Sequence, residues 1–271
     1  MQNKVSVITV CYNEEKNIGS TLDSILSQDY PGLSCIVKDG GSEDATLDIV
    51  RKYAEAFDER NIPFTIISGK DKGIYDGMNT AVLQAEGDWI LFLNAGDRFY
   101  SKKVLSEIFI AKDWSRTDLI YGDTAEEEYG ELHLFRKAPE RIAERMPFSH
   151  QSCFVRKEWL LKYPFKLKYP IAADYDFLLT LHFEGAVMKD SGAAVSTVSK
   201  DGVSSVKLID TYRESLRVKK SHGIALPSKK EFRKLIFMLR IKQWGMDHFP
   251  DSLKHLIRKI QWSIRGQRRL K

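Results

Sequence analysis

No stretch of this sequence is long and apolar enough to span a bilayer, which takes about 20 consecutive apolar residues. The longest apolar run near the C-terminus, Leu235–Leu239, is far shorter. A secretory leader is not expected, because Glu14, Glu15 and Lys16 follow the apolar start directly and no small-residue cleavage site intervenes. We therefore predict a cytoplasmic protein whose first apolar run is a strand.

Cysteine is also scarce. The three residues, Cys11, Cys35 and Cys153, have no C-x-x-C spacing, which argues against a disulfide framework and a zinc site and favours buried thiols in a reducing compartment. The glycine fingerprint G-x-G-x-x-G is missing too, since CYNEEKN follows the first strand. Its absence disfavours a dinucleotide-dependent oxidoreductase, a rival class for a sheet of this kind.

The sequence does have the composition of a globular protein, with an uneven distribution of charge. Of its 271 residues, 43% are hydrophobic and 29% are charged, and the net charge is +5. Residues 229–271 contain thirteen lysines and arginines against three acids, so the preceding part is net negative. We accordingly predict a domain over residues 1–228 and a basic tail over residues 229–271.

Strand-like apolar runs alternate with segments of helical period in the first hundred residues. Helices are predicted from an N-cap at Asn13, from an N-cap at Ser42 as far as Phe57, and over Tyr75–Gln84. The strands are predicted at Val5–Val10, Cys35–Val37, Phe64–Ile67 and Trp89–Leu93. This order predicts an α/β fold with a mostly parallel central sheet and helices on both faces.

The second half of the chain has a mixed pattern. A strand is predicted at Asp118–Tyr121, and helices at Asp174–His182 and Asp210–Lys220. The basic tail reads as two amphipathic helices broken near Phe249 and Pro250, the second with an apolar face of Leu253, Leu256, Ile257 and Ile260. Cations opposite bulky side chains such as Trp244 and Trp262 suit a membrane surface. Packing of the tail on the domain is the alternative.

Polar residues gather where the predicted strands end, and ligands of open parallel sheets bind at that edge. Asp39 follows the second strand and precedes two glycines, which suits either a ligand contact or an ordinary turn. The segment DKGIYDGMN holds acids and an amide near a helix start, as a hydroxyl-rich ligand would require. Asp97 ends the stretch WILFLNAGD and is either a turn residue or a metal ligand.

Taken together, five blocks resemble the successive motifs of family 2 glycosyltransferases. The blocks are VSVITVCYNEEKNI, VKDGGSEDAT, DKGIYDGMNTAV, GDWILFLNAGD, and HQSCFVRKEW with IAADYDFLL after it. They cover residues 4–205 in order, and the likeness is greatest to bacterial enzymes that build exopolysaccharide, capsule or O-antigen. The resemblance implies a GT-A fold, which binds nucleotide-diphospho-sugars, with the basic tail as a C-terminal helical extension.

The resemblance also implies roles for individual residues. Asp97 matches a ligand of Mg²⁺ or Mn²⁺, and Asp174 matches the base that takes the acceptor's proton. His150 and Gln151 match a pair near the diphosphate or the acceptor. The residues that match the sugar-donor site are Thr9, Tyr12, Glu14, Asp39, Asp71, Gly73, Asp76, Asn79 and Asn94.

Two departures from the family pattern bear on the metal and the base. Asn94 and Gly96 stand where relatives usually have acids, and Ala173 stands where a glutamate usually precedes the base. Mg²⁺ can bind through one carboxylate plus substrate phosphates, so a metal site remains workable but should be weak without the sugar donor. On a helix, Asp176 should point to a different side from Asp174.

These observations predict an inverting, metal-dependent glycosyltransferase that moves a sugar from a nucleotide-diphospho-sugar, expected to be UDP-linked. The expected acceptor is a glycan or polyprenyl-linked hydroxyl in cell-surface polysaccharide synthesis. Peripheral contact with the cytoplasmic face of the inner membrane through the basic tail would suit such an acceptor. Nucleic acid is not an expected partner, because no recognition module accompanies the tail. The alternative, raised by Asn94 and Gly96, is a non-catalytic nucleotide-sugar-binding subunit.

Overall fold

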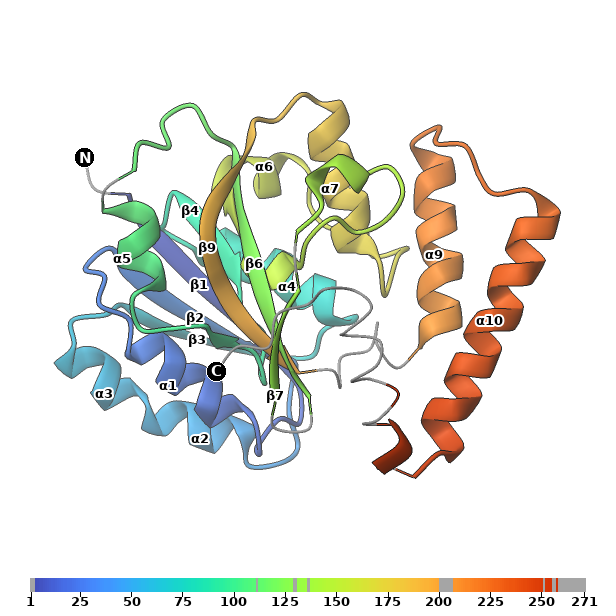
Figure 1. Ribbon diagram of the computed structural model, residues 1–271. Helices are drawn as coiled ribbons and strands as arrows, with labels where there is room; N and C mark the ends of the chain where they lie inside the picture. Colours follow the sequence, from blue (N-terminus) through green and yellow to red (C-terminus); the bar gives the residue numbers. More distant parts are fainter. Residues whose placement is uncertain are drawn as a thin grey trace.

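A computed structural model describes residues 3–110, 112–128, 131–135, 137–199, 207–250, 252–254 and 257. Four parallel strands form one half of its central sheet, in the order β3-β2-β1-β4 (Figure 1). They are β1 (Val5–Cys11), β2 (Leu33–Asp39), β3 (Phe64–Ser68) and β4 (Trp89–Phe92). All four were predicted. Their carboxyl ends consequently lie along one edge of the sheet.

The other half of the sheet is mixed, and it continues from β4 through β8, β6, β9 and β5. β8 runs antiparallel to β4 and β6, whereas β6 and β9 are parallel to each other. The bounds are β5 (Arg98–Phe99), β6 (Leu119–Glu128), β7 (Glu131–Phe135), which pairs with β6, β8 (Cys153–Arg156) and β9 (Met188–Ser199). The fold is therefore α/β with a curled sheet, and parallel pairing prevails in its first half.

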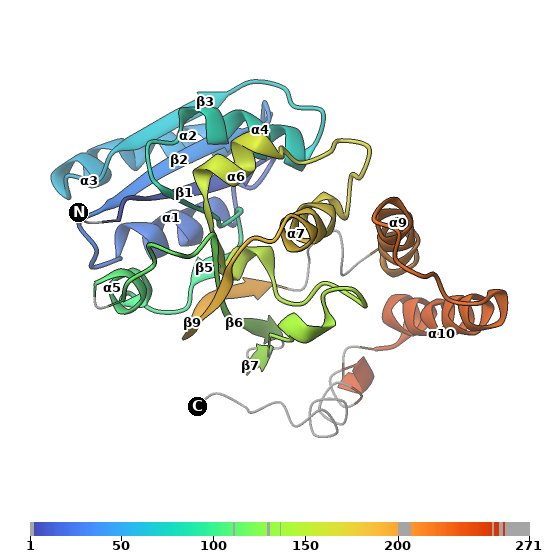
Figure 2. The same cartoon turned by 90° about the horizontal axis from the view of Figure 1, so that it is seen from above.

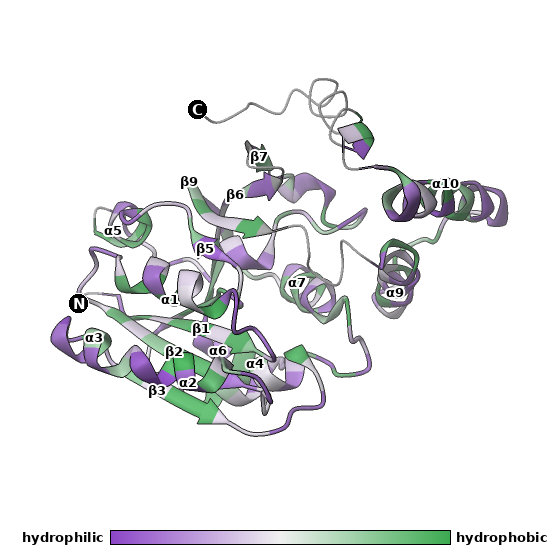
Figure 3. Cartoon of the chain, turned by 90° about the horizontal axis from the view of Figure 1, so that it is seen from below, coloured by the Kyte–Doolittle hydropathy of each residue, from purple (hydrophilic) through white to green (hydrophobic). Residues whose placement is uncertain are grey.

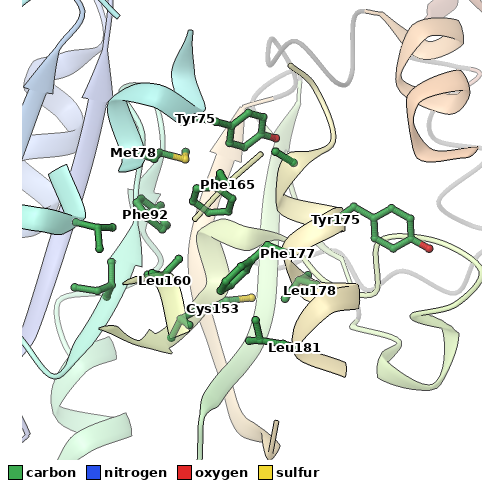
Figure 4. Close-up of a cluster of buried hydrophobic side chains, with 14 of the residues drawn as sticks. Tyr75, Met78, Phe92, Cys153, Leu160, Phe165, Tyr175, Phe177, Leu178 and Leu181 are labelled. Atoms are coloured by element: carbon green, nitrogen blue, oxygen red, sulfur yellow. The ribbon is translucent and has the colours of Figure 1, made fainter. Parts of the chain in front are cut away.

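Helices cover both faces of the sheet, as predicted (Figure 2). Odd-numbered side chains of β1, such as Val7, pack with α1 (Ile18–Leu26), α2 (Thr46–Lys52), α3 (Ala54–Glu59) and α5 (Val104–Phe109). Even-numbered ones, such as Ile8, pack with α4 (Ile74–Gln84), α6 (Lys157–Lys162) and α7 (Ala173–Phe183). The second cluster includes Phe92, Phe165 and Phe177, whose rings meet edge to face (Figure 4). Both faces of β1, β2 and β4 are thus buried, as continuous apolar runs require, whereas the edge strand β3 is more exposed.

Two predicted helix starts are wrong. Asn13 does not cap α1, which begins at Ile18, because Asn13 adopts a left-handed backbone with φ of 53°. Ser42 does not cap the next helix, which begins at Thr46. Both side chains instead accept hydrogen bonds from backbone N–H groups of the neighbouring loop, so they join two loops and do not cap a helix. The predicted helix to Phe57 is also divided at Tyr53, whose hydroxyl turns away and donates to Asp23 of α1 (2.8 Å).

Two further helices lie beyond the sheet. α9 (Leu208–Ser221) packs beside α7, and α10 (Lys229–His248) lies on the outer side of α9 (Figures 1 and 2). Ser228 and Glu231 form a capping box at the start of α10. The chain then breaks at Phe249 and Pro250 as predicted. Most of the second predicted tail helix, including Leu256, Ile260 and Trp262, falls outside the described residues.

The distribution of hydropathy follows this architecture. Strands in the centre of the sheet are largely apolar, while α10 shows both apolar and polar residues along its surface (Figure 3). Within the described part of the chain, none of the helices combines the length and the hydropathy that crossing a membrane would need.

Candidate active site

A cavity of about 950 Å³ opens where β1, β2 and β4 end. Most of the residues that line it come from the ends of these strands, the loops after them and after β3, the segment before β8, and the start of α7. The others come from the start of α4 and from β6, β7 and β9. Among the predicted site residues it brings together Tyr12, Glu14, Asp71, Gly73, Asn94, Asp97, His150, Gln151 and Asp174. The predicted residues Thr9, Asp39, Asp76 and Asn79 do not line it.

The loops that follow β1 and β2 are bonded to each other at one side of the cavity. The backbone N–H of Asn13 donates to Ser42 Oγ (2.9 Å), and that of Glu43 donates to Asn13 Oδ1 (2.9 Å). Glu14 N–H donates to Thr46 Oγ1 (2.7 Å). These bonds fix the rim on which the ring of Tyr12 stands 56% exposed. An exposed aromatic ring at a cavity rim can stack on a flat ligand group.

Asp39 shapes this region without entering the cavity. Its carboxylate is fully buried and accepts hydrogen bonds from Gly41 N–H (3.1 Å), Ser42 N–H (3.1 Å) and Ser68 Oγ (2.7 Å). Burial alone would raise the pKa of Asp39, but the bonds from Ser42 and Ser68 hold it below its ordinary value. Thr9 is likewise buried and donates to the carbonyl of Leu93 (2.9 Å). Both residues therefore support the cavity from behind.

Lys38 is a buried cation that sequence reasoning missed. Its ammonium donates to Asp71 Oδ2 (2.8 Å) and to the carbonyls of Asp39 and Gly69 (2.7 Å each). All three N–H groups are thus used, and Asp71 is held at the cavity wall. A Cβ on Gly77 would lie 3.0 Å from Asp71 Oδ2, so glycine leaves room for this carboxylate. A single lysine in the apolar run CIVKD was the available signal.

Asp76 and Asn79 make structural contacts. Asp76 accepts from Lys72 N–H (2.9 Å), which stabilises the first turn of α4. The Asn79 amide bonds both backbone groups of Phe165, as donor to the carbonyl and as acceptor from the N–H (2.9 Å each). The structure therefore does not bring Asn79 to the sugar-donor site that the resemblance implied. It joins α4 to the segment after α6 instead.

Asp97 lies in a tight turn directly after β4. Its N–H donates to the carbonyl of Asn94 (2.9 Å), and Gly96 takes φ of +95°, where glycine is favoured. The Asp97 side chain is 7% exposed and accepts from Gln151 Nε2 (3.1 Å). Burial raises its pKa to about 6, although Gln151 and His150 act in the opposite direction. Asp97 is thus a turn residue and also an under-compensated buried acid.

Asn94 provides the second feature of a cation site. Its Oδ1 is buried and accepts no hydrogen bond within the described structure. An orphaned amide oxygen and a poorly compensated carboxylate in one turn are oxygen ligands of the kind that Mg²⁺ or Mn²⁺ prefers. The described residues hold no group of three His, Cys, Asp or Glu side chains arranged for a metal. The pair Asn94 and Asp97 therefore fits a divalent cation whose remaining ligands would have to come from substrate and water.

Asp174 lies in the first turn of α7 and faces His150. The two side chains are 17% and 22% exposed, with His150 Nδ1 3.0 Å from Asp174 Oδ2. The other carboxylate oxygen accepts from Tyr175 N–H (2.8 Å). His150 Nε2 makes a longer contact of 3.5 Å with Asn94 Nδ2. The histidine thus orients Asp174, whose oxygens keep capacity for a further hydrogen-bond donor in the cavity.

The turn η2 (His150–Ser152) connects the two ends of the site, because His150 contacts Asp174 while Gln151 contacts Asp97. Asp176 is 2% exposed and points elsewhere, as predicted. It pairs with His222 Nε2 (3.0 Å) and Lys166 Nζ (2.9 Å). Of the two acids in this turn, Asp174 alone lines the cavity.

Apolar side chains complete the cavity, and sequence reasoning identified none of them. Phe148 stacks on Tyr121 with ring centroids 4.6 Å apart, and Met146 precedes it in the same segment. Further members are Phe135, Pro170, Ile171 and Val198. Except for Ile171, which begins the block IAADYDFLL, these residues lie outside the motif blocks, so only the folded chain shows that they adjoin the polar groups.

Comparison with known proteins assigns this architecture to a family. The family model described as "Glycosyl transferase family 2" matches residues 6–165. The "PGL/p-HBAD biosynthesis glycosyltransferase" of Mycobacterium tuberculosis is 34% identical over 175 residues, which cover 64% of this chain and 67% of that protein. Glycosyltransferase AglE of Haloferax volcanii is 37% identical over 92 residues, covering 33% and 29% respectively.

Solved structures confirm the fold. Staphylococcus aureus TarS in complex with UDP-GlcNAc superposes with a TM-score of 0.66 at 20% identity and covers 90% of this chain and 73% of that one. The mannosyltransferase PcManGT from Pyrobaculum calidifontis, in complex with GDP-Man and Mn²⁺, gives 0.64 at 18% identity, with coverage of 88% and 69%. Both are GT-A glycosyltransferases, as the predicted fold requires. The chain is a glycosyltransferase and belongs to glycosyl transferase family 2.

Proposed function

We propose that this glycosyltransferase transfers a sugar from a UDP-linked donor to a hydroxyl of a glycan or polyprenyl-linked acceptor by a single, inverting displacement. The observation that carries the proposal is the pair of differently solvated carboxylates in one cavity. Asp97 is buried beside an orphaned amide oxygen, whereas Asp174 is partly exposed and oriented by a histidine. Carboxylates in such different environments are suited to different tasks.

Asp174 is the general base of this proposal. His150 Nδ1 lies 3.0 Å from one of its carboxylate oxygens and Tyr175 N–H donates to the other, and these two contacts fix the orientation of the carboxylate. An ionised carboxylate can accept the proton of the acceptor hydroxyl as that oxygen attacks the anomeric carbon. The bond between that carbon and the diphosphate oxygen breaks on the opposite face, so the configuration inverts.

Asn94 and Asp97 would hold the divalent cation, together with phosphate oxygens of the sugar donor. When bound, such a cation neutralises negative charge on the leaving nucleoside diphosphate. Gln151 keeps the Asp97 carboxylate oriented, and the turn from Asn94 to Asp97 keeps both side chains on one segment. With so few protein ligands, cation affinity should depend on the diphosphate.

Two observations bear on the sugar donor and the acceptor. TarS was crystallised with UDP and with UDP-GlcNAc, which supports a UDP-linked donor, while PcManGT with GDP-Man makes GDP-linked sugars the competing choice. The apolar residues Met146, Phe148 and Ile171 line the same cavity as Asp174 and would suit an acceptor with an apolar portion. An acceptor used in cell-surface polysaccharide synthesis, linked to a lipid, has that character.

The outer face of α10 supports peripheral attachment to a membrane. Its inner face packs through Ile236, while Phe237, Ile241 and Trp244 are 64%, 55% and 55% exposed on the opposite side. The stripe is flanked by Lys230, Arg233, Lys234 and Arg240. Aromatic and apolar side chains between cations suit an anionic lipid surface. Two copies of this face would bring like charges together, which disfavours self-association.

A panel of nucleotide sugars tests the proposal. Purified protein with Mn²⁺ or Mg²⁺ should release nucleoside diphosphate from one donor, faster with a polyprenyl-linked acceptor than without it. Proton NMR of the product should show the anomeric configuration opposite to that of the donor. A product with retained configuration would refute the single displacement. A non-catalytic nucleotide-sugar-binding subunit is not favoured, because the related proteins are glycosyltransferases and Asp174 has the setting of a base.

A further inference from the structure

The helix that carries Asp174 has no side-chain cap at its N-cap position. Its N-cap residue is Ala172, which has no side-chain acceptor for the free N–H groups of the first turn. Glu214 of α9 supplies an acceptor instead. Its Oε1 accepts from both Ile171 N–H and Ala172 N–H, at 2.7 Å each. In a capping box an acid at the third helical position bonds to the N-cap N–H, but here that acid comes from another helix.

Glu214 is buried, being 3% exposed, and it does not line the cavity. A buried carboxylate is retained where hydrogen bonds compensate its desolvation, and a helix N-terminus adds a favourable dipole. The two bonds converge on one oxygen, which defines the position of the backbone that enters α7. That backbone is two residues from Asp174.

α9 packs against α7, so the position of Glu214 relative to α7 is fixed (Figure 1). Val218 is fully buried in the same apolar cluster as α7, and Ser221 Oγ lies 3.1 Å from the Tyr169 hydroxyl. At the end of α9, His222 pairs with Asp176 of α7 (3.0 Å). Contacts along the C-terminal half of α9 therefore hold it against α7 and the segment before α7.

The segment held by Glu214 also forms part of the cavity wall. Ile171 lines the cavity, and its carbonyl accepts a hydrogen bond from the Tyr75 hydroxyl of α4 (2.9 Å). Glu214 and Tyr75 thus hold the two backbone groups of Ile171 from different helices. A shift of this segment would move the Asp174 carboxylate relative to the acceptor hydroxyl.

We propose that Glu214 is a positioning residue for the transfer step, which sets the place of Asp174 from outside the cavity. The proposal rests on the proposed role of Asp174 as the base. Because misplacing a reacting group by about 1 Å can cost roughly 100-fold in rate, loss of Glu214 should act on kcat. α9, like α7, lies beyond residues 6–165, the part of the chain that the family model matches.

Three substitutions of Glu214 in the full chain test this, with Asp210→Ala, at an exposed acid one turn earlier in the same helix, as the matched control. Glu214→Ala removes the acceptor and should lower kcat for transfer about 10- to 100-fold, with the KM for the sugar donor little changed. Glu214→Asp keeps the charge but has a shorter side chain, which moves the acceptor oxygen away from the two N–H groups, so it should lower kcat to a similar extent. It replaces Glu214→Ala in the test if that variant does not fold. Glu214→Gln keeps an acceptor oxygen and should restore most of the rate.

A double-mutant cycle separates positioning from general stability. In an Asp174→Asn background, Glu214→Ala should cause no further loss of the residual rate, because its effect passes through Asp174. If Glu214→Ala and Glu214→Asp match Asp210→Ala in kcat, or if Glu214→Gln is no better than Glu214→Ala, the positioning role is refuted. If Asp174→Asn keeps the wild-type rate, the proposed base is itself wrong, and that result is distinct from the first.

Discussion

The fold buries the carboxyl group of Asp97 even when no cation is bound to compensate its negative charge. Its pKa is raised from 3.8 to about 6, and the folded protein therefore holds a proton at Asp97 more tightly than the unfolded chain does. The contribution of Asp97 to the free energy of unfolding is therefore fully present below its pKa in the unfolded chain, and it is lost as the pH rises through about 6. At pH 8 the metal-free protein consequently folds against the cost of a buried charge.

The isosteric change Asp97→Asn should stabilise the metal-free protein at pH 8. A shift from 3.8 to about 6, at about 1.4 kcal/mol per unit, corresponds to roughly 3 kcal/mol of unfolding free energy. Thermal unfolding in EDTA should show a higher Tm than the wild type, and the gain should shrink as the pH falls toward 4. The exposed Asp58→Asn serves as control. A lower Tm for Asp97→Asn at pH 8 would contradict the desolvation argument.

Single residues show where the sequence predicts the site and where it does not. Residues at strand ends, such as Asp97, were predicted because parallel topology alone places them at one edge. Lys38 was missed because its partners, Asp71 and the Gly69 carbonyl, lie on another loop. The resemblance predicted that Asn79 contacts the sugar donor. In the structure its amide is hydrogen-bonded to the backbone of Phe165, a contact that no local sequence pattern predicts.

Asn79 also provides a test at the level of helices, because it joins α4 to the segment after α6. Asn79→Ala should lower the free energy of unfolding by about 1 to 3 kcal/mol, since it leaves both Phe165 backbone groups unpaired. Affinity for the sugar donor, measured by titration calorimetry, should stay near that of Leu83→Ala, an exposed control on α4. A large loss of donor affinity with normal stability would restore the role that the resemblance implied.

The outer face of α10 is a second feature of this scale. Replacing Phe237, Ile241 and Trp244 by serine should lower binding to vesicles with anionic lipid at least tenfold, because it removes most of the exposed apolar stripe. Tm should change little, since more than half of each of these side chains is exposed to solvent. Ile236→Ser, on the buried inner face of α10, is the contrasting control, because it should lower Tm. Unchanged vesicle binding of the triple variant would contradict the membrane proposal.

Elements were predicted better than their boundaries. Apolar periodicity placed β1 to β4 and α4, because their burial follows directly from the pattern. The caps at Asn13 and Ser42 were wrong because both side chains bond between loops, a tertiary demand that outweighs local preference. The antiparallel strand β8 begins two residues after Gln151, and its pairing with β4 depends on contacts distant in sequence.

At the level of the whole molecule, the cavity joins two parts of the chain. Loops up to Asp97 form the side with the proposed cation ligands, and residues from Met146 to Asp174 form the side with the base. η2 connects them through His150 and Gln151. A cation bound on one side should therefore be coupled to the proposed nucleotide, which would span the cavity.

Titration of Mn²⁺ should show this coupling. With two protein ligands, Mn²⁺ alone should bind weakly, and UDP should raise the affinity for Mn²⁺ at least tenfold. By thermodynamic linkage, Mn²⁺ must raise the affinity for UDP by the same factor. Asp97→Asn should abolish the coupling, whereas Asp58→Asn should not. Tight binding of Mn²⁺ to the protein without nucleotide would show that the cation site is built differently.

The most direct test of the central claim is the rate of transfer by Asp174→Asn at saturating sugar donor and Mn²⁺. Without its general base, the enzyme should lose about 100- to 10,000-fold in kcat. Affinity for the donor should stay within about threefold of the wild type, because Asp174 lies with His150 on the acceptor side. A variant that keeps a tenth or more of the wild-type rate, or that loses donor binding, would contradict the assignment of Asp174.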